Sequence, residues 1–301
     1  MLIGWAGIGK MGSPMVRAVL SGGHEVVVLE PLPENRASAV AAGARVAQSI
    51  EQLAAETDIV ITTVARDEVL HDLVLGEDGF ARHLRAPQIF VDVSTVSPRL
   101  SAEIAAALDA RSVPYLRAPV SGSTVTAGSA QLSAMVSGPR EAWLRVEPVL
   151  ACFSARQFWV GEGDEARYLK LAVNVILGGT SALLAEALAI GRCGGLPVSV
   201  LMDVICQSAV GSPLLAYKQE AVVRQDFEPS FSIEQMIKDL ELIGDVAAAA
   251  GVSTVLSDVV RRRFEAARRQ GLGEMDYFVL AQSFPLAQAV APDAPATPDV
   301  G

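Results

Sequence analysis

The chain of 301 residues is poor in cysteine, has no dense cluster of basic residues, and lacks the start of a signal peptide. Its three cysteines, Cys152, Cys193 and Cys206, have neither metal-ligand spacing nor an even count, so they disfavour a metal site and a disulfide framework. We expect them to be small core residues in a reducing compartment. The formal net charge of −10 disfavours nucleic acid and an anionic membrane surface as main partners. The missing signal peptide predicts a cytoplasmic protein.

One stretch, residues 169–190, is apolar and long enough to cross a bilayer. It carries Lys170, Asn174 and Glu186, which are costly in lipid, and the sequence offers no comparable stretch to form a bundle with it. We therefore predict a buried helix between two domains and no membrane partner.

The N-terminus combines a short apolar run with three spaced glycines and a helix-compatible segment. Gly7 permits a tight turn, Gly9 lets the backbone approach a pyrophosphate, and Gly12 lets the helix pack close to the strand. The helix N-terminus offers N–H groups to the phosphates. This pattern predicts a dinucleotide-binding unit, although glycines alone are equally compatible with an ordinary turn.

The next apolar run, residues 24–29, ends on the acid Glu30, which lies 18 residues beyond Gly12. A carboxylate at this place binds the adenosine ribose hydroxyls and repels a 2′-phosphate, so it favours NAD over NADP. The alternative is a solvated strand end. Arg36 leaves room for a phosphate, so NADP stays open.

Further strand-like runs alternate with helix-like runs over the first half of the chain. The strands are expected at residues 57–63, 88–93, 113–117, 133–137 and 157–160, and the helices at 34–42, 66–75 and 98–111. This alternation predicts an α/β fold, a Rossmann-type doubly wound parallel sheet over residues 1–163. A long interdomain helix at 165–192 begins an all-helical domain, 164–290, and residues 291–301 read as a disordered tail.

Five stretches, in their order and spacing, resemble the β-hydroxyacid dehydrogenases, which include 3-hydroxyisobutyrate, tartronate semialdehyde, L-threonate and 6-phosphogluconate dehydrogenases. They are residues 7–15, 92–98, 118–123 with 127–128 and 132–138, Lys170 and Asn174 with 185–187, and 226–231 with 238–240. The resemblance implies NAD as cofactor. It implies cofactor contacts from Gly7, Ile8, Gly9, Lys10, Met11, Gly12, Glu30, Val64, Thr95 and Lys238. It implies substrate contacts from Ser121, Gly122, Ser123, Lys170, Asn174 and Lys238.

The chemistry needs a group that takes the hydroxyl proton while hydride leaves. A lysine does this when burial or a nearby cation lowers its pKa. Lys170 lies in an apolar helix four residues before Asn174, so both side chains share one face. Without the resemblance, a lysine that reaches solvent near a helix start is the simpler interpretation.

The carboxylate of the substrate needs hydrogen-bond donors. Ser121, Gly122 and Ser123 supply hydroxyls and backbone N–H groups, although an ordinary polar turn would have the same composition. Lys238, which the resemblance brings to the site, would by composition be a surface charge paired with Glu234 or Glu241.

Several positions depart from the family pattern. Val173 replaces the first of two asparagines, Arg117 replaces an acid, and Ser123 replaces a glycine. The Pro often found after the third strand is absent from residues 64–66. Counting four residues from Gly163 puts Arg167 at the lysine position, whereas counting back from residues 185–187 gives Lys170, which we prefer because loops tolerate insertions.

The sequence thus predicts a cytoplasmic, homodimeric or homotetrameric NAD-dependent oxidoreductase of a short β-hydroxyacid, or of the matching semialdehyde in reverse. It predicts no nucleic acid, membrane or metal partner. One alternative is an imine reductase, against which the retained Lys170 and Asn174 argue. The other is a non-catalytic dinucleotide-binding module, against which Lys170 argues.

Overall fold

The structure, a computed structural model, describes residues 1–282, and contacts divide them into two units. The first unit holds residues 1–174 and 245–251, and the second holds the other described residues. The first turns of the long helix therefore pack with the sheet. The predicted tail at 291–301, like the end of the predicted 164–290 domain, lies outside the described residues.

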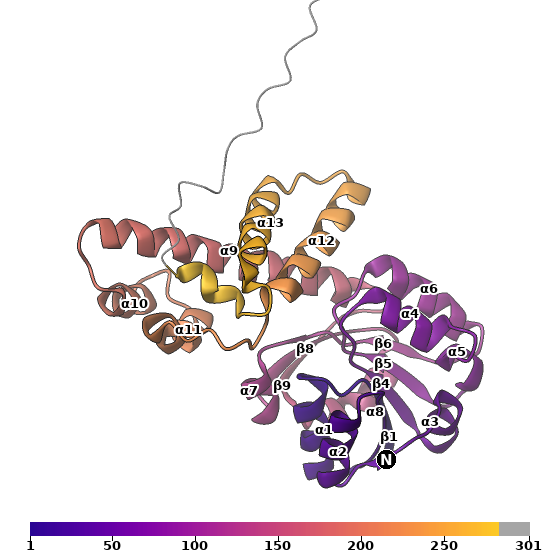
Figure 1. Ribbon diagram of the computed structural model, residues 1–301. Coiled ribbons are helices and arrows are strands. Elements are labelled where there is room, and N and C mark those ends of the chain that lie inside the picture. Colours follow the sequence, from indigo (N-terminus) through magenta and orange to yellow (C-terminus); the bar gives the residue numbers. More distant parts are fainter. Residues whose placement is uncertain (283–301) are drawn as a thin grey trace, which may run out of the picture. The chain divides into compact units, whose positions relative to one another are not determined.

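A nine-stranded sheet forms the centre of the first unit (Figure 1). Its strands are β1 (Leu2–Ala6), β2 (Glu25–Leu29), β3 (Arg45–Val46), β4 (Ile59–Thr62), β5 (Ile89–Asp92), β6 (Tyr115–Arg117), β7 (Val120–Ser121), β8 (Leu132–Ser137) and β9 (Ser154–Gly161). The first six are parallel in the order β3-β2-β1-β4-β5-β6, whereas β8 is antiparallel to β6 and β7 and parallel to β9. This order reverses between β1 and β4, as in doubly wound sheets that bind dinucleotides, and it confirms the predicted fold class.

Helices cover both faces of this sheet (Figure 1). They are α1 (Gly12–Ser21), α2 (Pro33–Ala41), α3 (Ile50–Glu56), α4 (Asp67–Leu75), α5 (Phe80–His83), α6 (Pro98–Asp109), α7 (Thr124–Gly128) and α8 (Arg140–Ala151). Ile59 and Ile61 of β4 face one apolar core with α1 and α8, and Val60 between them faces the other core with α3 to α6. Because both faces are buried, the strands read in the sequence as continuous apolar runs.

The second unit is helical, as predicted. Its elements are most of α9 (Glu165–Cys193), then α10 (Val198–Gln207), α11 (Pro213–Arg224), α12 (Ile233–Ala250) up to residue 244, and α13 (Val255–Ala267), followed by a π turn (Arg268–Leu272) and a 3-10 helix, η2 (Tyr277–Ala281). Within residues 175–282 the only β pairing is an isolated bridge between Ser232 and Asp276. The predicted long helix at 165–192 agrees with α9 to within one residue.

Helix α9 is the one helix in residues 1–282 that is apolar and long enough to span a membrane, with a mean hydropathy of 1.7 over its most apolar window. A single helix of this kind is weak evidence for a span, since core helices of soluble proteins share these properties. Its buried residues include Arg167 and Ser181, which bond to protein groups: Arg167 to Asp92, and the Ser181 hydroxyl to the Tyr277 carbonyl at 2.7 Å. These polar contacts are those of a helix packed against protein.

Candidate active site

The glycine loop after β1 has the geometry that a pyrophosphate requires. Gly7 has φ +83°, and a Cβ there would lie 2.3 Å from the Thr63 carbonyl oxygen. Gly9 has open space where its Cβ would be, so a ligand's phosphates can approach the backbone. A Cβ at Gly12 would lie 2.5 Å from the Gly7 carbonyl oxygen. The three positions therefore need glycine for a turn, an approach and a close packing, and the loop fits a dinucleotide.

Helix α1 begins in this loop. No side chain caps its N-terminus at Met11, and Lys10 beside it is exposed. An uncapped helix N-terminus presents N–H groups and a partial positive charge, which suits an anionic pyrophosphate.

Glu30 fastens this loop to the end of β2. Its Oε2 accepts a hydrogen bond from the Ile8 N–H at 2.7 Å, and its Oε1 accepts one from the Leu32 N–H at 3.0 Å. Glu30 is 7% exposed, so it is not a solvated strand end. A carboxylate has about four acceptor positions, so the two bonds leave room for ribose hydroxyls. Arg36 lies at the same strand end, because its Nη1 donates to the Glu30 and Pro31 carbonyls at 3.2 Å.

The loops after β4 and β5 are bonded to each other. The Val64 N–H donates to Ser94 Oγ at 2.9 Å, and Ser94 Oγ donates to Asp92 Oδ1 at 2.6 Å. Thr62 Oγ1 donates to the same Asp92 oxygen at 2.8 Å. Thr95, half-buried, follows directly in this loop. Two predicted cofactor contacts, Val64 and Thr95, thus lie on loops that share one buried carboxylate.

Two arginines form a buried cluster with Asp92, Tyr115 and Asp164, here called the arginine cluster. Arg167 is 1% exposed, and its Nη2 donates to Asp92 Oδ2 at 2.5 Å and to Tyr115 Oη at 2.7 Å. Arg117 donates from Nε to Asp164 Oδ1 at 2.8 Å, and its guanidinium lies 4.2 Å from the Tyr115 ring centre. Sequence reasoning noted Arg117 and Arg167 as departures and did not foresee that they pack together.

Burial and charge act on the pKa values of this cluster. Burial acts to lower the pKa of the Arg167 guanidinium, but Tyr115 and Asp92 beside it outweigh burial and raise the pKa above its ordinary value. Burial raises the pKa of the Tyr115 hydroxyl. Arg167 therefore keeps its proton and cannot serve as a base.

Lys170 and Asn174 lie one turn apart on α9, within the first unit. Lys170 is half-buried, and Asn174 is completely buried. Side chains four residues apart on a helix share a face, so an amino group and a neutral hydrogen-bonding group lie on the same side of α9.

Lys238 belongs to α12 in the second unit. Its Nζ lies 2.9 Å from Asp239 Oδ1, and its side chain is 22% exposed. Glu234, one of the two glutamates suggested by composition, lies 3.6 Å from Arg268.

The loop at residues 121–123 is shaped by its own hydrogen bonds. Gly122 has φ +141°, and a Cβ there would lie 2.5 Å from the Leu132 and Thr126 side chains. Ser123 caps α7: its N–H donates to Thr126 Oγ1 at 2.6 Å, and its Oγ accepts from the Thr126 N–H at 3.3 Å. Both polar groups of Ser123 therefore serve the loop, while Ser121 is half-buried and Gly122 is exposed.

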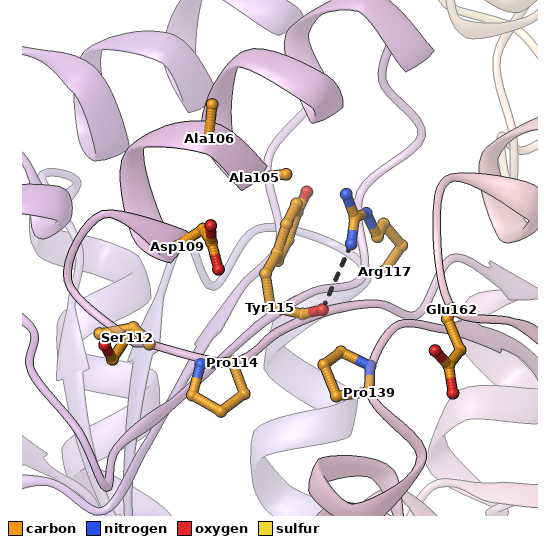
Figure 2. A pocket seen from close by; sticks show the side chains of 10 residues that line it. Ala105, Ala106, Asp109, Ser112, Pro114, Tyr115, Arg117, Pro139 and Glu162 are labelled. Atoms are coloured by element: carbon orange, nitrogen blue, oxygen red, sulfur yellow. Dashed lines mark hydrogen bonds between the residues drawn. The ribbon is translucent and has the colours of Figure 1, made fainter.

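A hollow of about 540 Å³ opens beside β6 and α6 in the same unit (Figure 2). Tyr115 and Arg117 line it together with Asp109, Pro139 and Glu162, and Arg117 Nη1 donates to the Tyr115 carbonyl. None of the predicted cofactor or substrate residues is among the described residues that line it. Tyr115 and Arg117 belong both to this hollow and to the arginine cluster.

The cysteines differ from expectation. Cys193 is exposed at the end of α9, so the prediction that it is a core residue is wrong. Cys206 is partly buried, and Cys152 is partly buried and packs against the apolar core of the first unit. Within residues 1–282, no group of three or more His, Cys, Asp or Glu side chains is placed to hold a metal ion.

Two family models match successive parts of the chain. The NAD binding domain of 6-phosphogluconate dehydrogenase matches residues 2–161. The model described as NAD-binding of NADP-dependent 3-hydroxyisobutyrate dehydrogenase matches residues 164–283. The boundary between the two matches lies just before α9.

Individual proteins agree with these models. The 3-hydroxyisobutyrate dehydrogenase of Pseudomonas aeruginosa is 32% identical over 269 residues, covering 87% of this chain and 90% of that protein. The crystal structure of 3-hydroxyisobutyrate dehydrogenase from Salmonella typhimurium has a TM-score of 0.85 at 28% identity, covering 94% of this chain and 100% of that one. An imine reductase from Pseudomonas sp. has a TM-score of 0.61 at 20% identity, covering 93% and 97%, and shows a shared fold alone.

Proposed function

We propose, from the premise that this chain belongs to the β-hydroxyacid dehydrogenase family and is an NAD(P)-dependent oxidoreductase, that its substrate is a short β-hydroxyacid similar to 3-hydroxyisobutyrate. The product is the matching semialdehyde, and the reverse reduction uses the same residues. The observation that carries this proposal is the pair of Lys170 and Asn174 on one face of α9, in the unit that also holds the glycine loop.

When bound, NAD supplies the hydride acceptor. Gly7 to Gly12 hold the pyrophosphate, and the loops with Val64 and Thr95 lie on the nicotinamide side. Lys170 Nζ takes the proton of the substrate hydroxyl as the carbon gives up its hydride, and returns a proton to the aldehyde oxygen in the reverse direction. Asn174 donates a hydrogen bond that orients the reacting oxygen. The proton and the hydride leave the substrate by separate routes, and the alcohol becomes a carbonyl.

The substrate carboxylate is assigned to the loop at residues 121–123. Ser121 and Gly122 supply the donors, and Ser123 holds the loop in shape through its bonds to Thr126. Lys238 is a further predicted contact to substrate or cofactor, on the strength of the family pattern. A substrate of this class is small and anionic, which an acidic protein binds through local donors.

NAD is the favoured cofactor. Glu30 is a buried carboxylate just beyond the end of β2, where dinucleotide-binding folds carry the acid that binds the ribose hydroxyls, and its charge would repel the 2′-phosphate of NADP. Arg36 at the same strand end is the feature that favours NADP, but its Nη1 is engaged with two backbone carbonyls.

Lys170 distinguishes the proposed function from the two alternative functions. An imine reductase of related architecture shares this fold, and the retained Lys170 and Asn174 favour a hydroxyacid. A non-catalytic dinucleotide-binding module has no need for a lysine on the buried side of α9. A cytoplasmic location is part of this proposal and rests on the sequence.

The proposed function also includes self-association of the chain. Helix α9 exposes Leu169, Ile176, Leu183 and Ile190, one every seven residues, and Ile190 is 74% exposed. An apolar stripe with this period suits a second copy of the chain, as a homodimer or homotetramer. Sedimentation that shows only monomer at micromolar concentration would contradict it.

The test is turnover with a panel of short hydroxyacids. Purified protein is mixed with NAD and each of 3-hydroxyisobutyrate, glycerate, serine, threonate and 6-phosphogluconate, and NADH is followed by absorbance. We expect at least one short β-hydroxyacid to give turnover, and NAD to exceed NADP. Turnover with cyclic imines alone would favour the imine reductase, and binding of NAD without any turnover would favour the non-catalytic module.

A further inference from the structure

Arg167 joins the beginning of α9 to the loop after β5. Its Nη1 donates to the Ser94 carbonyl at 2.7 Å, and its Nη2 donates to Asp92 Oδ2. These bonds connect positions 73 and 75 residues apart in the chain. Because Arg167 and Asp92 are 1% and 0% exposed, solvent cannot replace either partner.

The carboxylate that Arg167 holds is also the centre of the nicotinamide-side loops. Asp92 Oδ1 accepts bonds from Thr62 Oγ1, the Ser94 N–H and Ser94 Oγ. Ser94 Oγ in turn accepts the Val64 N–H. A displacement of Arg167 is therefore passed to both loops, since the contacts of Asp92 are buried and Ser94 Oγ bonds to both Asp92 and the Val64 N–H.

Arg167 also sets the orientation of the catalytic turn. Lys170 lies three residues later on the same helix, and Asn174 seven residues later, so all three side chains lie on one side of α9. A helix is stiff over two turns, so fixing the side chain of Arg167 fixes how far α9 is rotated about its axis. That rotation decides where Lys170 Nζ points.

A second guanidinium holds the residue just before the helix. Arg117 donates from Nε to Asp164 Oδ1, and the Asp164 carbonyl accepts the Arg167 N–H at 2.9 Å. Arg117 directly precedes residues 118–123, the predicted carboxylate loop. The two arginines thus anchor the start of α9 to both loops that are proposed to face the substrate and the nicotinamide.

Only an arginine makes all of these bonds at position 167. Its planar fork carries five N–H donors, which here reach Asp92, Ser94 and Tyr115 at once. A lysine keeps the positive charge beside Asp92 but has one compact ammonium group, so it cannot keep the three directions.

We propose that Arg167 is a positioning residue that orients Lys170 and Asn174 relative to the loop at Asp92 to Thr95. This role rests on the proposed function, because it acts through Lys170. It is separate from binding, since the contacts of Arg167 are to the protein's own loops and not to the cofactor's pyrophosphate.

The test compares Arg167→Lys with Arg145→Lys. Arg145 is an exposed arginine of the same unit whose guanidinium donates twice to the Pro87 carbonyl. Arg145→Lys therefore also replaces a guanidinium that makes several bonds by an ammonium group, but away from the arginine cluster. The measurements are kcat, KM, NAD affinity by calorimetry, thermal unfolding, and hydrogen exchange of peptides covering residues 92–97 and 165–174.

We expect Arg167→Lys to fold, to lower kcat about 10- to 100-fold, and to change both KM values and NAD affinity less than about threefold. Exchange should rise in the two named peptides, and Arg145→Lys should match the wild type. A folded Arg167→Lys with kcat within about twofold of wild type overturns the proposal. So does a loss of kcat that accompanies an equal loss of NAD affinity.

Two further outcomes are covered. If Arg167→Lys does not fold, the double variant Asp92→Asn/Arg167→Met, which removes both buried charges together, replaces it, and an unchanged kcat in that folded variant overturns the proposal. If the wild type turns over no hydroxyacid, the proposed function fails by itself. The hydrogen-exchange data then test whether Arg167 holds the start of α9 against the loop after β5. Unchanged protection of residues 165–174 in Arg167→Lys overturns this role, and an increase in exchange confined to the peptides 92–97 and 165–174 supports it.

Discussion

The glycine loop and the first turns of α9 hold their functional groups in place by opposite means. The loop depends on absent side chains at Gly7, Gly9 and Gly12 and on one carboxylate, Glu30, which lies 22 residues from Ile8. The start of α9 depends on large polar and charged side chains that meet from segments 47 to 75 residues apart. The loop leaves space for a ligand, whereas the arginine cluster fills space with buried ion pairs.

This difference assigns separate tasks to the two regions. Changes in the glycine loop should alter cofactor affinity, because the loop is proposed to bind the pyrophosphate and to contact no reacting atom. Changes on α9 should alter kcat, because α9 carries Lys170, the proposed proton carrier, and Arg167, its proposed positioning residue. Each of the following variants checks one side of that division.

The largest effect is expected for Lys170→Met. Loss of the proton carrier should lower kcat about 1,000-fold, while NAD affinity stays within about threefold. Lys170→Arg is the matched control, because it keeps the positive charge but holds its proton too tightly to serve as a base. Steady-state kinetics and calorimetry measure both. Substantial turnover by either variant would show that another group takes the proton.

An intermediate effect is expected for Glu30→Gln. An amide cannot accept both the Ile8 and Leu32 N–H bonds, so the loop loses one buried bond and the ribose loses a charged partner. NAD affinity should fall about tenfold, the preference for NAD over NADP should shrink, and kcat at saturating cofactor should change little. Glu34→Gln, an exposed acid of α2, is the control and should behave as wild type. If Glu30→Gln lowered kcat and left NAD affinity unchanged, the assignment of cofactor binding to the glycine loop would be wrong.

The smallest effect is expected for Tyr115→Phe. Near pH 8 the variant should unfold about 1 kcal/mol more easily, because the Tyr115 oxygen no longer accepts the Arg167 bond. Burial raises the pKa of Tyr115, so the folded chain keeps the phenol protonated above the ordinary value of 10.0 at which the unfolded chain ionises. Tyrosine 115 thus stabilises the wild type below that pH, and this contribution is lost as pH rises beyond it.

The difference between wild type and Tyr115→Phe should therefore narrow above about pH 10. Urea unfolding at two pH values measures it, with Tyr168→Phe as the control, since Tyr168 is 52% exposed. Turnover should change less than about threefold, because Arg167 keeps its hydrogen bonds to Asp92 and to the Ser94 carbonyl. A difference that widens at alkaline pH would mean that Tyr115 ionises readily in the fold.

Much of the fold was predictable because its signals are local. The apolar runs gave the central strands to within a few residues, and the long apolar stretch predicted α9. Strands β3 and β7, with two residues each, are too short to show a period, so they escaped prediction. The site was predictable where residue spacing alone sets geometry, as at Gly7, Gly9 and Gly12.

The sequence by itself determined the doubly wound sheet, the helical second unit, the dinucleotide loop and the family, because each rests on short spacings of residue types. Only the tertiary structure decided that Glu30 is buried on the Ile8 N–H, that Ser123 serves its own loop, and that Arg167 pairs with Asp92. The physical reason is that a buried charge needs a partner, and the partner is chosen by which segments the sheet brings together. No local pattern connects residue 92 to residue 167.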